Sequence, residues 1–397
     1  MESSKPMNRL LQGDVGSGKT IVSIIAMYLN HLSGYQSALM VPTEILATQH
    51  YQNIKKLLGE NINVELLTGS TSKKDKQRIY EGLANGTTSI VIGTHALIQE
   101  DVVYKNLGLV VTDEQHRFGV NQSDNLKNKG LTPDVLYMSA TPIPRTYALT
   151  IYGDMDVSTI KELPKGRQEI TTILKKNEEI DDVLNLMYDE LKQNHQIYVI
   201  APLIEESDTS NLTSVNELKE KMNKAFGKKY KIDIVHGKMA SGNKEEIMKK
   251  FSMGDIDILI STTVIEVGID VKNASQMVIF DANRFGLSTL YQLRGRVGRG
   301  NIKSSCILIS SQDTKRLEIL KTTSDGFKLS EEDFKLRGSG DLFGTKQSGD
   351  MFFKIANIRD DYKILVQAGK DALEFLNKAS ISNLKIRDNL ISKIKHS

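Results

Sequence analysis

The sequence is poor in the features that mark secreted and membrane-embedded proteins. It contains one cysteine, Cys306, which rules out an internal disulfide framework and, lying in an apolar run, is most simply a small core residue. No apolar stretch approaches the roughly 20 residues needed to span a bilayer, and no signal peptide opens the chain. These absences predict a cytoplasmic protein.

The sequence also lacks a strong excess of charge of either sign. The formal net charge is +3 at pH 7, which permits a polyanionic partner without requiring one. Any nucleic-acid binding must therefore be argued from local motifs. At 397 residues, the chain is long enough for two or three domains.

A phosphate-binding loop lies near the start of the chain. Leu10 and Leu11 suit a buried parallel strand, and Ile21–Leu32 predicts a helix whose positive N-terminal end faces an anion. Between them, the pattern G-x-x-x-x-G-K-[ST] is fitted by Gly13, Asp14, Val15, Gly16, Ser17, Gly18, Lys19 and Thr20. We expect Lys19 to reach the β- and γ-phosphates of ATP, and the Thr20 hydroxyl to ligate Mg²⁺.

Strands alternate with helices through the rest of the first half. The predicted strands are 37–41, 63–67, 90–92, 109–112 and 135–138, and the predicted helices are 73–85 and one that starts at Pro42-Thr43-Glu44 with Thr43 as N-cap. This alternation predicts a parallel sheet with covered faces, in which ligands bind at the carboxyl ends of the strands.

Two carboxylates follow the strand that ends at Thr112. We expect Asp113 to hold Mg²⁺, through water, and Glu114 to orient and polarise an attacking water molecule. The alternative is a solvated acidic turn. After the next predicted strand, Ser139 and Thr141 are candidates for linking the nucleotide site to another site, although Ser and Thr are also ordinary loop residues.

A second alternating set follows residues 153–166, which lose the rhythm and predict an interdomain linker. Its predicted strands are 169–174, 197–201, 232–235, 256–260, 277–280 and 306–309, with helices at 180–193, 215–226, 244–253 and 287–293. The predicted fold is therefore α/β, with domains at 1–155 and 168–325, a linker at 156–167 and a helical region at 326–397. Because the second set has no phosphate loop of its own, we expect one nucleotide to be shared between two domains.

Three arginines and three glycines gather in Gln292–Gly300. Arg suits the stabilisation of charge on a transferring phosphoryl group, so Arg296 and Arg299 are candidates for that role, with Gln292 beside them. A basic helix end in solvent, or a nucleic-acid contact, remains the alternative. Upstream, the stretch Thr262–Asp270 follows a strand and could face both the nucleotide and a polymer, with Gly268 and Asp270 as candidate nucleotide contacts.

Taken together, these motifs resemble those of superfamily 2 helicases. Within them LLQGDVGSGKT, DEQHRFGV, ATPIPRT, STTVIEVGIDV and YQLRGRVGRG are similar to the RecG family of bacterial ATP-dependent DNA helicases. Transcription-repair coupling factors have a similar motor, but Gln12, Ser17 and Gln115 match the RecG versions. The resemblance implies two RecA-like domains, ATP and Mg²⁺ as cofactors, and a nucleoid-associated role in DNA recombination and repair on forked duplexes and Holliday junctions. It implies a monomer, with a single-strand binding protein as a candidate partner.

The resemblance also assigns residues outside the nucleotide site. His116 would couple the nucleotide to the DNA groove, and Leu336–Gly349 resembles a translocation motif in which Arg337 and Gln347 would transmit movement. Loops at strand ends suit phosphate contacts through backbone N–H and hydroxyl groups, although such residues also favour ordinary turns. These DNA-contact candidates are Pro42, Thr43, Thr68, Gly69, Gly93, Thr94, His236, Gly237, Thr262 and Thr263.

The sequence departs from the family at its start, where we expect it to lack the wedge region that splits a branch point. The alternative function is then an ATP-switched DNA-binding module without unwinding.

Overall fold

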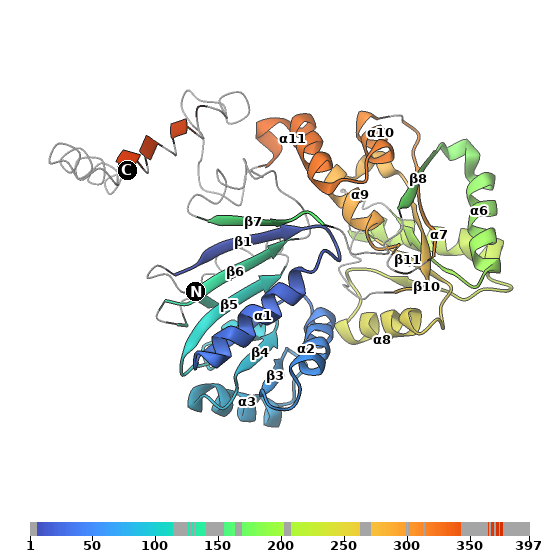
Figure 1. Ribbon diagram of the computed structural model, residues 1–397. Coiled ribbons are helices and arrows are strands. Elements are labelled where there is room, and N and C mark those ends of the chain that lie inside the picture. Colours follow the sequence, from blue (N-terminus) through green and yellow to red (C-terminus); the bar gives the residue numbers. More distant parts are fainter. Residues whose placement is uncertain are drawn as a thin grey trace. The chain divides into compact units, whose positions relative to one another are not determined.

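The computed structural model describes most of the first 342 residues and a few beyond them (Figure 1). The described residues are 6–113, 126–127, 129–130, 132–139, 155–162, 169–201, 208–262, 271–298, 300, 302–312, 314–342, 364, 367–368, 371–372 and 374–375. The chain divides into two compact units, one formed by 1–143 with 154–333 and one by 144–153 with 334–397. Both β-sheets belong to the first unit.

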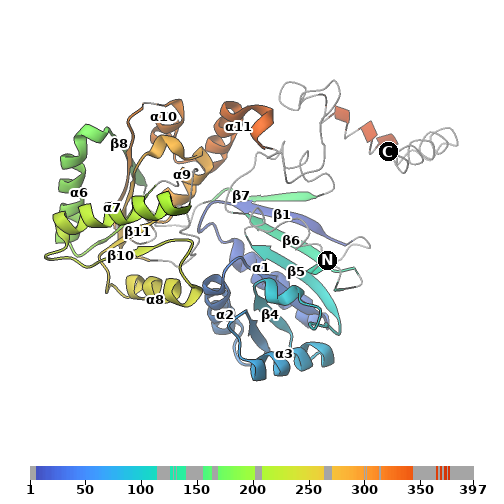
Figure 2. The ribbon, with the colours of Figure 1, turned by 180° about the vertical axis from the view of Figure 1, so that it is seen from behind.

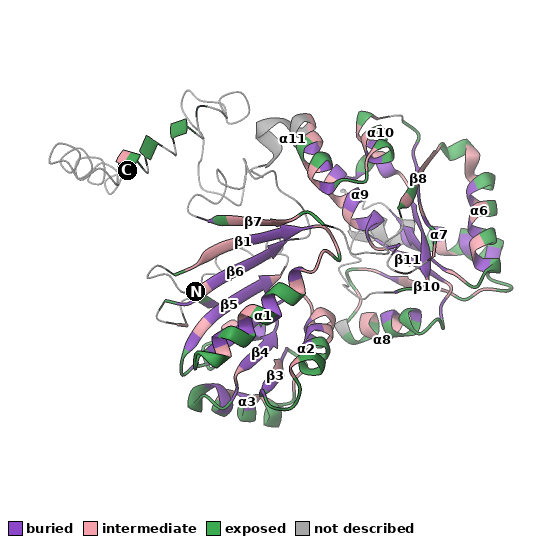
Figure 3. Cartoon of the chain, in the orientation of Figure 1, coloured by how far each residue is buried: buried purple, intermediate pink, exposed green. Residues whose placement is uncertain are grey.

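The first sheet has seven strands in the order β3-β4-β2-β5-β6-β1-β7. All of its neighbouring strands run parallel. The strands are β1 (Asn8–Gly13), β2 (Gln36–Met40), β3 (Val64–Leu67), β4 (Ile90–Gly93), β5 (Leu107–Asp113), β6 (Asp134–Ser139) and β7 (Asp156–Ile160). Its central strands are buried almost throughout, as Figure 3 shows, which explains their near-continuous apolar sequence.

Helices α1 (Lys19–Leu32) and α2 (Glu44–Leu58) share one hydrophobic core with the first sheet. Ile24 and Met27 of α1 and Ala47 and Ile54 of α2 are buried there, against strand residues such as Leu39. A short 3₁₀ helix, η1 (His95–Ile98), follows β4. Because each helix starts just after a strand, both helices have their N-termini at the carboxyl edge of the sheet.

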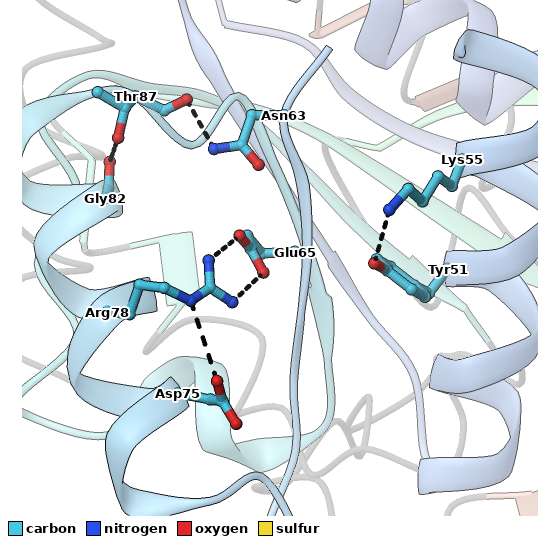
Figure 4. A network of polar contacts seen from close by, with 8 residues as sticks. All are labelled: Tyr51, Lys55, Asn63, Glu65, Asp75, Arg78, Gly82 and Thr87. Atoms are coloured by element: carbon cyan, nitrogen blue, oxygen red, sulfur yellow. Dashed lines mark hydrogen bonds and ion pairs between the residues drawn. The ribbon is translucent and has the colours of Figure 1, made fainter. Parts of the chain in front are cut away.

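Helix α3 (Lys73–Asn85) is fastened to the edge strand β3 by polar contacts (Figure 4). The Arg78 guanidinium donates to both carboxylate oxygens of Glu65, with Nη2 to Oε2 at 2.9 Å, and this hydrogen bonding raises the pKa of Arg78. At the end of the helix, Asn63 Nδ2 donates to the carbonyl oxygen of Thr87 at 3.1 Å. These contacts fix the loop between β3 and α3, which carries Thr68 and Gly69.

Strand β7 corrects the prediction of a linker over 156–167. Asp156–Ile160 pairs in parallel with β1, and Arg9 donates to Ser158 Oγ at 2.8 Å and to Asp156 Oδ2 at 2.9 Å. The segment has few apolar residues because it is an edge strand with no fully buried position. A search for apolar periodicity therefore missed it.

The second sheet has six parallel strands in the order β10-β11-β9-β12-β13-β8. They are β8 (Ile170–Lys175), β9 (Gln196–Ile200), β10 (Ile232–Val235), β11 (Ile258–Ser261), β12 (Ala274–Ile279) and β13 (Ser304–Ile309). When the strands of each sheet are numbered along the chain, this order repeats that of the first sheet from β3 to β1. The two sheets are thus copies of one topology, and the predicted α/β class is confirmed.

Helices form two cores with this second sheet (Figures 1 and 2). One core contains residues of α6 (Ile180–Lys192) and α7 (Asp208–Phe226). The other contains residues of α8 (Ser241–Ser252), α9 (Leu287–Arg294), α10 (Lys315–Thr322) and α11 (Gly326–Leu342). Two short 3₁₀ helices lie between strands and helices of this sheet: η3 (Asn177–Glu179) follows β8 and precedes α6, and η4 (Ala282–Arg284) follows β12 and precedes α9.

The two sheets also share a buried glutamine, with similar hydrogen bonds, at the start of equivalent strands. Gln36 opens β2, and its Nε2 donates to the carbonyl oxygens of Leu83 and Thr88 at 3.0 and 2.8 Å. Gln196 opens β9, and its Nε2 donates to the carbonyl oxygens of Phe251 and Ile256. Each buried amide satisfies carbonyl groups between a helix end and the next strand, so the repeat extends beyond topology to side chains.

Three further observations concern the helices. Helix α10 was not predicted, because its eight residues span barely two turns. Helix α11 continues to Leu342, so the stretch that begins at Leu336 is helical over its first seven residues. No described helix is long and apolar enough to cross a membrane.

Candidate functional site

The glycine-rich loop turns sharply between β1 and α1. Ser17 N donates to the carbonyl oxygen of Asp14 at 3.1 Å, and Gly16 and Gly18 have φ values of 78° and 96°, which favour glycine. Gly18 precedes α1 and has no side chain to cap it, and no acidic residue lies in the first turn. The N-terminal N–H groups of α1 therefore point to a site suited to a phosphate.

Lys19 lies within this loop and is only 9% exposed. Its ammonium group donates to the carbonyl oxygens of Gly13 and Asp14 at 2.9 and 2.8 Å. The Asp14 side chain in turn accepts from Val15 N at 2.7 Å. The ammonium group is thus held by carbonyl oxygens of the loop itself, from which it could reach a phosphate bound there.

The register of the strands places two further candidate residues, Asp113 and Ser139, beside the phosphate loop. Asp113 at the end of β5 is level with Met138 of β6, which is level with Leu11 of β1. Ser139 pairs with Gln12, directly before the loop. Adjacent strands lie about 4.8 Å apart, so Asp113 lies about 10 Å to the side of β1, which leaves room for phosphates and a hydrated ion.

The residues present fit a magnesium ion bound together with a nucleotide. Among the described residues no group of three or more His, Cys, Asp or Glu side chains is placed to hold a metal. Mg²⁺ in phosphate-loop proteins does not need such a cage, because phosphates and water complete its coordination. Thr20, at the start of α1, and Asp113 supply the hydroxyl and the carboxylate that this arrangement requires.

One contact at this site was not anticipated from the sequence. His50 of α2 is 7% exposed, and its Nε2 lies 3.2 Å from Asp113 Oδ2. The only indication of this contact in the sequence is that His50 lies on the buried face of an amphipathic helix, with Ala47 and Ile54. Its partner is distant in sequence, so only the fold reveals the contact.

The structure separates the roles of the arginines in the second half. Arg294 ends α9 and is 4% exposed, with Nη1 donating to the carbonyl oxygens of Leu320 and Thr323 at 2.7 and 3.1 Å. It therefore stabilises the packing of α10. Arg296 is half-buried just beyond the helix, and Gln292 is half-buried within it, so both remain candidates for the nucleotide site.

The DNA-contact candidates of the first sheet lie at the carboxyl ends of β3 and β4, and before α2. Thr43 caps α2, its hydroxyl accepting from Leu46 N at 3.3 Å, as predicted. Glu44 Oε1 accepts from Ser70 N at 3.1 Å, and Oε2 accepts from Ser70 Oγ at 2.5 Å, which ties this helix to the Thr68-Gly69-Ser70 turn. Thr94 Oγ1 is buried without a hydrogen-bond partner in the described part of the chain.

The second sheet presents its candidates at equivalent positions. Thr262 follows β11 as Thr94 follows β4, and its hydroxyl is likewise buried without a partner among the described residues. His236 and Gly237 follow β10, and Lys244 donates to the Gly237 carbonyl oxygen at 2.7 Å. Burial, followed by the charges of Lys244 and Lys238, lowers the pKa of His236.

Several predicted site residues lie outside the described residues. They are Glu114, His116, Thr141, Thr263, Gly268, Asp270, Arg299 and Gln347. Arg337 is described only as part of the backbone of α11.

Three family models match successive parts of the chain. Residues 2–150 match DEAD/DEAH box helicases, and residues 175–301 match the helicase conserved C-terminal domain. Residues 323–396 match domain 3, C-terminal, of the ATP-dependent DNA helicase RecG. Pro42, Thr43 and the phosphate loop fall in the first match, and Arg296 falls in the second.

Individual relatives give the same result. The chain is 54% identical to the ATP-dependent DNA helicase RecG of Staphylococcus epidermidis, over 93% of this chain and 55% of that protein. It is 53% identical to RecG of Staphylococcus aureus, over 93% of this chain and 54% of that protein. The chain thus spans about half the length of these relatives.

Solved structures agree on the fold. RecG bound to a three-way DNA junction matches with a TM-score of 0.75 and 46% identity, over 91% of this chain and 48% of that one. Dbp5 of S. cerevisiae, bound to RNA and ADP BeF3, matches with a TM-score of 0.60 at 19% identity, over 94% of this chain and 90% of that one, which supports the fold alone.

Two RecA-like parallel sheets with one phosphate loop, matched by both helicase models, define a superfamily 2 helicase motor. Within that class, the match over residues 323–396 and the identity to the staphylococcal proteins are decisive. Over 93% of its length, the chain is thus similar to RecG helicases.

Proposed function

We propose that this chain is an ATP-dependent DNA motor of the RecG type, which couples ATP hydrolysis to movement on branched duplex DNA. The observation that carries the proposal is that Asp113 is level with Leu11 of β1, two residues before the phosphate loop begins, in a chain whose second sheet repeats the topology without a loop. Fork reversal and processing of Holliday junctions are the proposed tasks.

The proposed roles follow from chemistry. Lys19 and the N-terminus of α1 bind the β- and γ-phosphates, and Glu114 orients the attacking water. Thr20 and Asp113 would hold Mg²⁺, which when bound neutralises phosphate charge. Arg296 and Arg299 neutralise the charge that develops during transfer, and Gln292 can donate a hydrogen bond beside them. Gly268 and Asp270 contact the nucleotide.

DNA would lie along the loops that end the strands of both sheets. Hydroxyl and backbone N–H groups of residues such as Thr94 and Thr262 suit phosphate oxygens and read no bases. Their buried, unpartnered hydroxyl groups support this role, because a buried polar group without a partner is costly unless a ligand supplies one. His116, Ser139, Thr141, Arg337 and Gln347 are the proposed coupling residues.

The test compares ATP hydrolysis with and without forked DNA. Lys19→Ala, Glu114→Gln and Arg299→Ala should each lower the DNA-stimulated rate at least a hundredfold, because each removes charge stabilisation or water activation. Lys228→Ala, at an exposed position after α7, serves as the control and should retain the wild-type rate. Full activity in any of the first three variants would contradict the assignment.

Strand displacement is measured separately on a labelled fork, because the chain spans about half the length of its relatives. Displacement that depends on ATP supports a helicase, and hydrolysis without displacement supports an ATP-switched module or a bare translocase. The match to RecG over residues 323–396 favours RecG over a transcription-repair coupling factor. Sedimentation would test the proposed monomer, and addition of a single-strand binding protein would test that partner.

A further inference from the structure

The contact between His50 and Asp113 joins a helix of the DNA-facing edge to the nucleotide site. His50 Nε2 lies 3.2 Å from Asp113 Oδ2, and the two side chains are 9% and 15% exposed. An ionised carboxylate only accepts hydrogen bonds, so the ring hydrogen lies on Nε2, and this N–H group donates a hydrogen bond to Oδ2. This bond fixes the rotation of the carboxylate about its Cβ–Cγ axis.

Packing alone does not account for an imidazole at this position. The other ring nitrogen, Nδ1, is buried and has no hydrogen-bond partner in the described part of the chain. A leucine would fill a similar volume against Ala47 and Ile54 without leaving a buried polar atom unpaired. The imidazole is therefore best explained by the hydrogen bond that it donates.

The same helix is attached to the candidate DNA-contact loops one to two turns earlier. Thr43 caps α2, and Glu44 accepts two hydrogen bonds from Ser70, in the turn after β3. Glu44 and His50 are six positions apart, a rise of about 9 Å at 1.5 Å per residue. One rigid element thus contacts the Thr68-Gly69-Ser70 turn at its start and Asp113 further along.

We propose that His50 is a positioning residue that orients the Asp113 carboxylate toward the nucleotide-bound Mg²⁺, and that α2 makes this orientation sensitive to DNA at Thr43 and the Ser70 turn. The inference rests on the function proposed above. It adds a route from DNA to the metal ligand that does not use His116.

The primary test measures nucleotide affinity and does not depend on turnover. A fluorescent ADP analogue is titrated with and without Mg²⁺ in the wild-type protein, His50→Leu and His50→Gln. His50→Leu should lose about tenfold or more of the affinity gained from Mg²⁺, as expected when the hydrogen bond to a ligating carboxylate is removed. Its affinity without Mg²⁺ should be unchanged.

His50→Gln keeps an N–H donor at a similar reach, and it should stay within about threefold of the wild-type Mg²⁺-dependent gain. His50→Asn carries the same amide on a shorter side chain and should resemble His50→Leu. The pair of amide variants keeps the test informative if the leucine variant fails to fold. Tyr51→Phe, at the next position of α2, is the matched control and should behave as the wild type.

The second readout is the ratio of the ATPase rates with and without forked DNA. This ratio should fall in His50→Leu and recover in His50→Gln. An unchanged Mg²⁺-dependent gain in His50→Leu would overturn the positioning role, and a normal stimulation ratio would overturn the route through α2. The proposed function is tested separately, by ATP hydrolysis in the wild-type protein and its loss in Lys19→Ala. The affinity comparison needs no hydrolysis, so the two proposals can fail independently.

Discussion

Gly93 shows how a single missing side chain shapes the edge that carries the candidate DNA contacts. It ends β4, directly before Thr94, and a Cβ atom placed on it would lie 2.0 Å from the carbonyl oxygen of Leu67 in β3. Because the obstacle is backbone on the neighbouring strand, a rotamer change cannot relieve the overlap. Glycine here permits two strand ends to approach closely where Thr94 must be placed.

We therefore expect Gly93→Ala to lower the free energy of unfolding by about 1–3 kcal/mol, the usual cost of overpacking a filled interior. Gly242→Ala in α8 is the matched control, since nothing lies within 4 Å of its built Cβ. It should raise stability by about 0.5–1 kcal/mol, because alanine is the better helix former. Urea denaturation followed by circular dichroism measures both, and equal effects of the two changes would refute the steric explanation.

At this scale, sequence reasoning identified residues whose roles are encoded locally. The phosphate loop is contiguous, so its glycines, Lys19 and Thr20 could be assigned from spacing. His50 and Asp113 are 63 positions apart, and Glu44 and Ser70 are 26 apart, so neither pair forms a local pattern. Arg294 was grouped with the other arginines because burial is not visible in a basic cluster.

Among the elements, the two strand-opening glutamines are the clearest sign of repetition. Gln36 makes three buried bonds, since its Oε1 also accepts from Asn106 N at 2.9 Å. Gln196 donates two, and its Oε1 has no partner in the described residues. The backbone N–H groups of both glutamines donate to an asparagine carbonyl oxygen, of Asn106 and Asn273 respectively.

Replacing these glutamines should destabilise the two sheets unequally. Gln36→Leu leaves two buried carbonyl oxygens and the part-buried Asn106 N–H unpaired and should lower the free energy of unfolding by about 3 kcal/mol, whereas Gln196→Leu should cost about 1 kcal/mol less. Gln193→Leu, at an exposed helix end, is the control and should be nearly neutral. Chemical denaturation tests the order, and a larger loss for Gln196→Leu would contradict it.

Elements with a strong apolar period were predicted from the sequence to within a few residues. The bounds of α3 agree fully with the prediction, because Ser72 caps its start and Gly86, with φ 85°, ends it. Strand β7 and helix α10 were missed, because one is an exposed edge strand and the other is short. Helix α11 continues through Gly338 and Gly340, although glycine usually favours a break.

Across the whole molecule, the two sheets have the same strand order, but only the first is followed by a phosphate-binding loop after its β1 position. Strand β8 occupies the position of β1 in the second sheet, but it ends at Lys175 and is followed by Lys176 and η3 in place of a glycine-rich turn. Alternation of strands and helices predicted both sheets and the absence of a second loop. It did not reveal the matching strand order, since register depends on pairing between distant segments.

A single loop predicts a single nucleotide. Isothermal titration with ADP and Mg²⁺ should give one site per chain, and Lys19→Ala should weaken binding at least tenfold, because a charge-assisted contact to phosphate is lost. Lys228→Ala, at an exposed position after α7, provides a control outside the loop and should retain one site. Two sites per chain would contradict the shared-nucleotide interpretation.

The buried thiol of Cys306 has a practical consequence. It lies in β13 at 0% exposure, and burial raises its pKa to about 12, so it is poorly reactive. Surface cysteines introduced one in each half of the chain, for example at Lys74 in α3 and at Lys228 after α7, would therefore accept maleimide dyes while the native thiol stays unlabelled. Energy transfer between such dyes would then report the distance between the two labelled positions with and without nucleotide, in a protein that keeps its own cysteine.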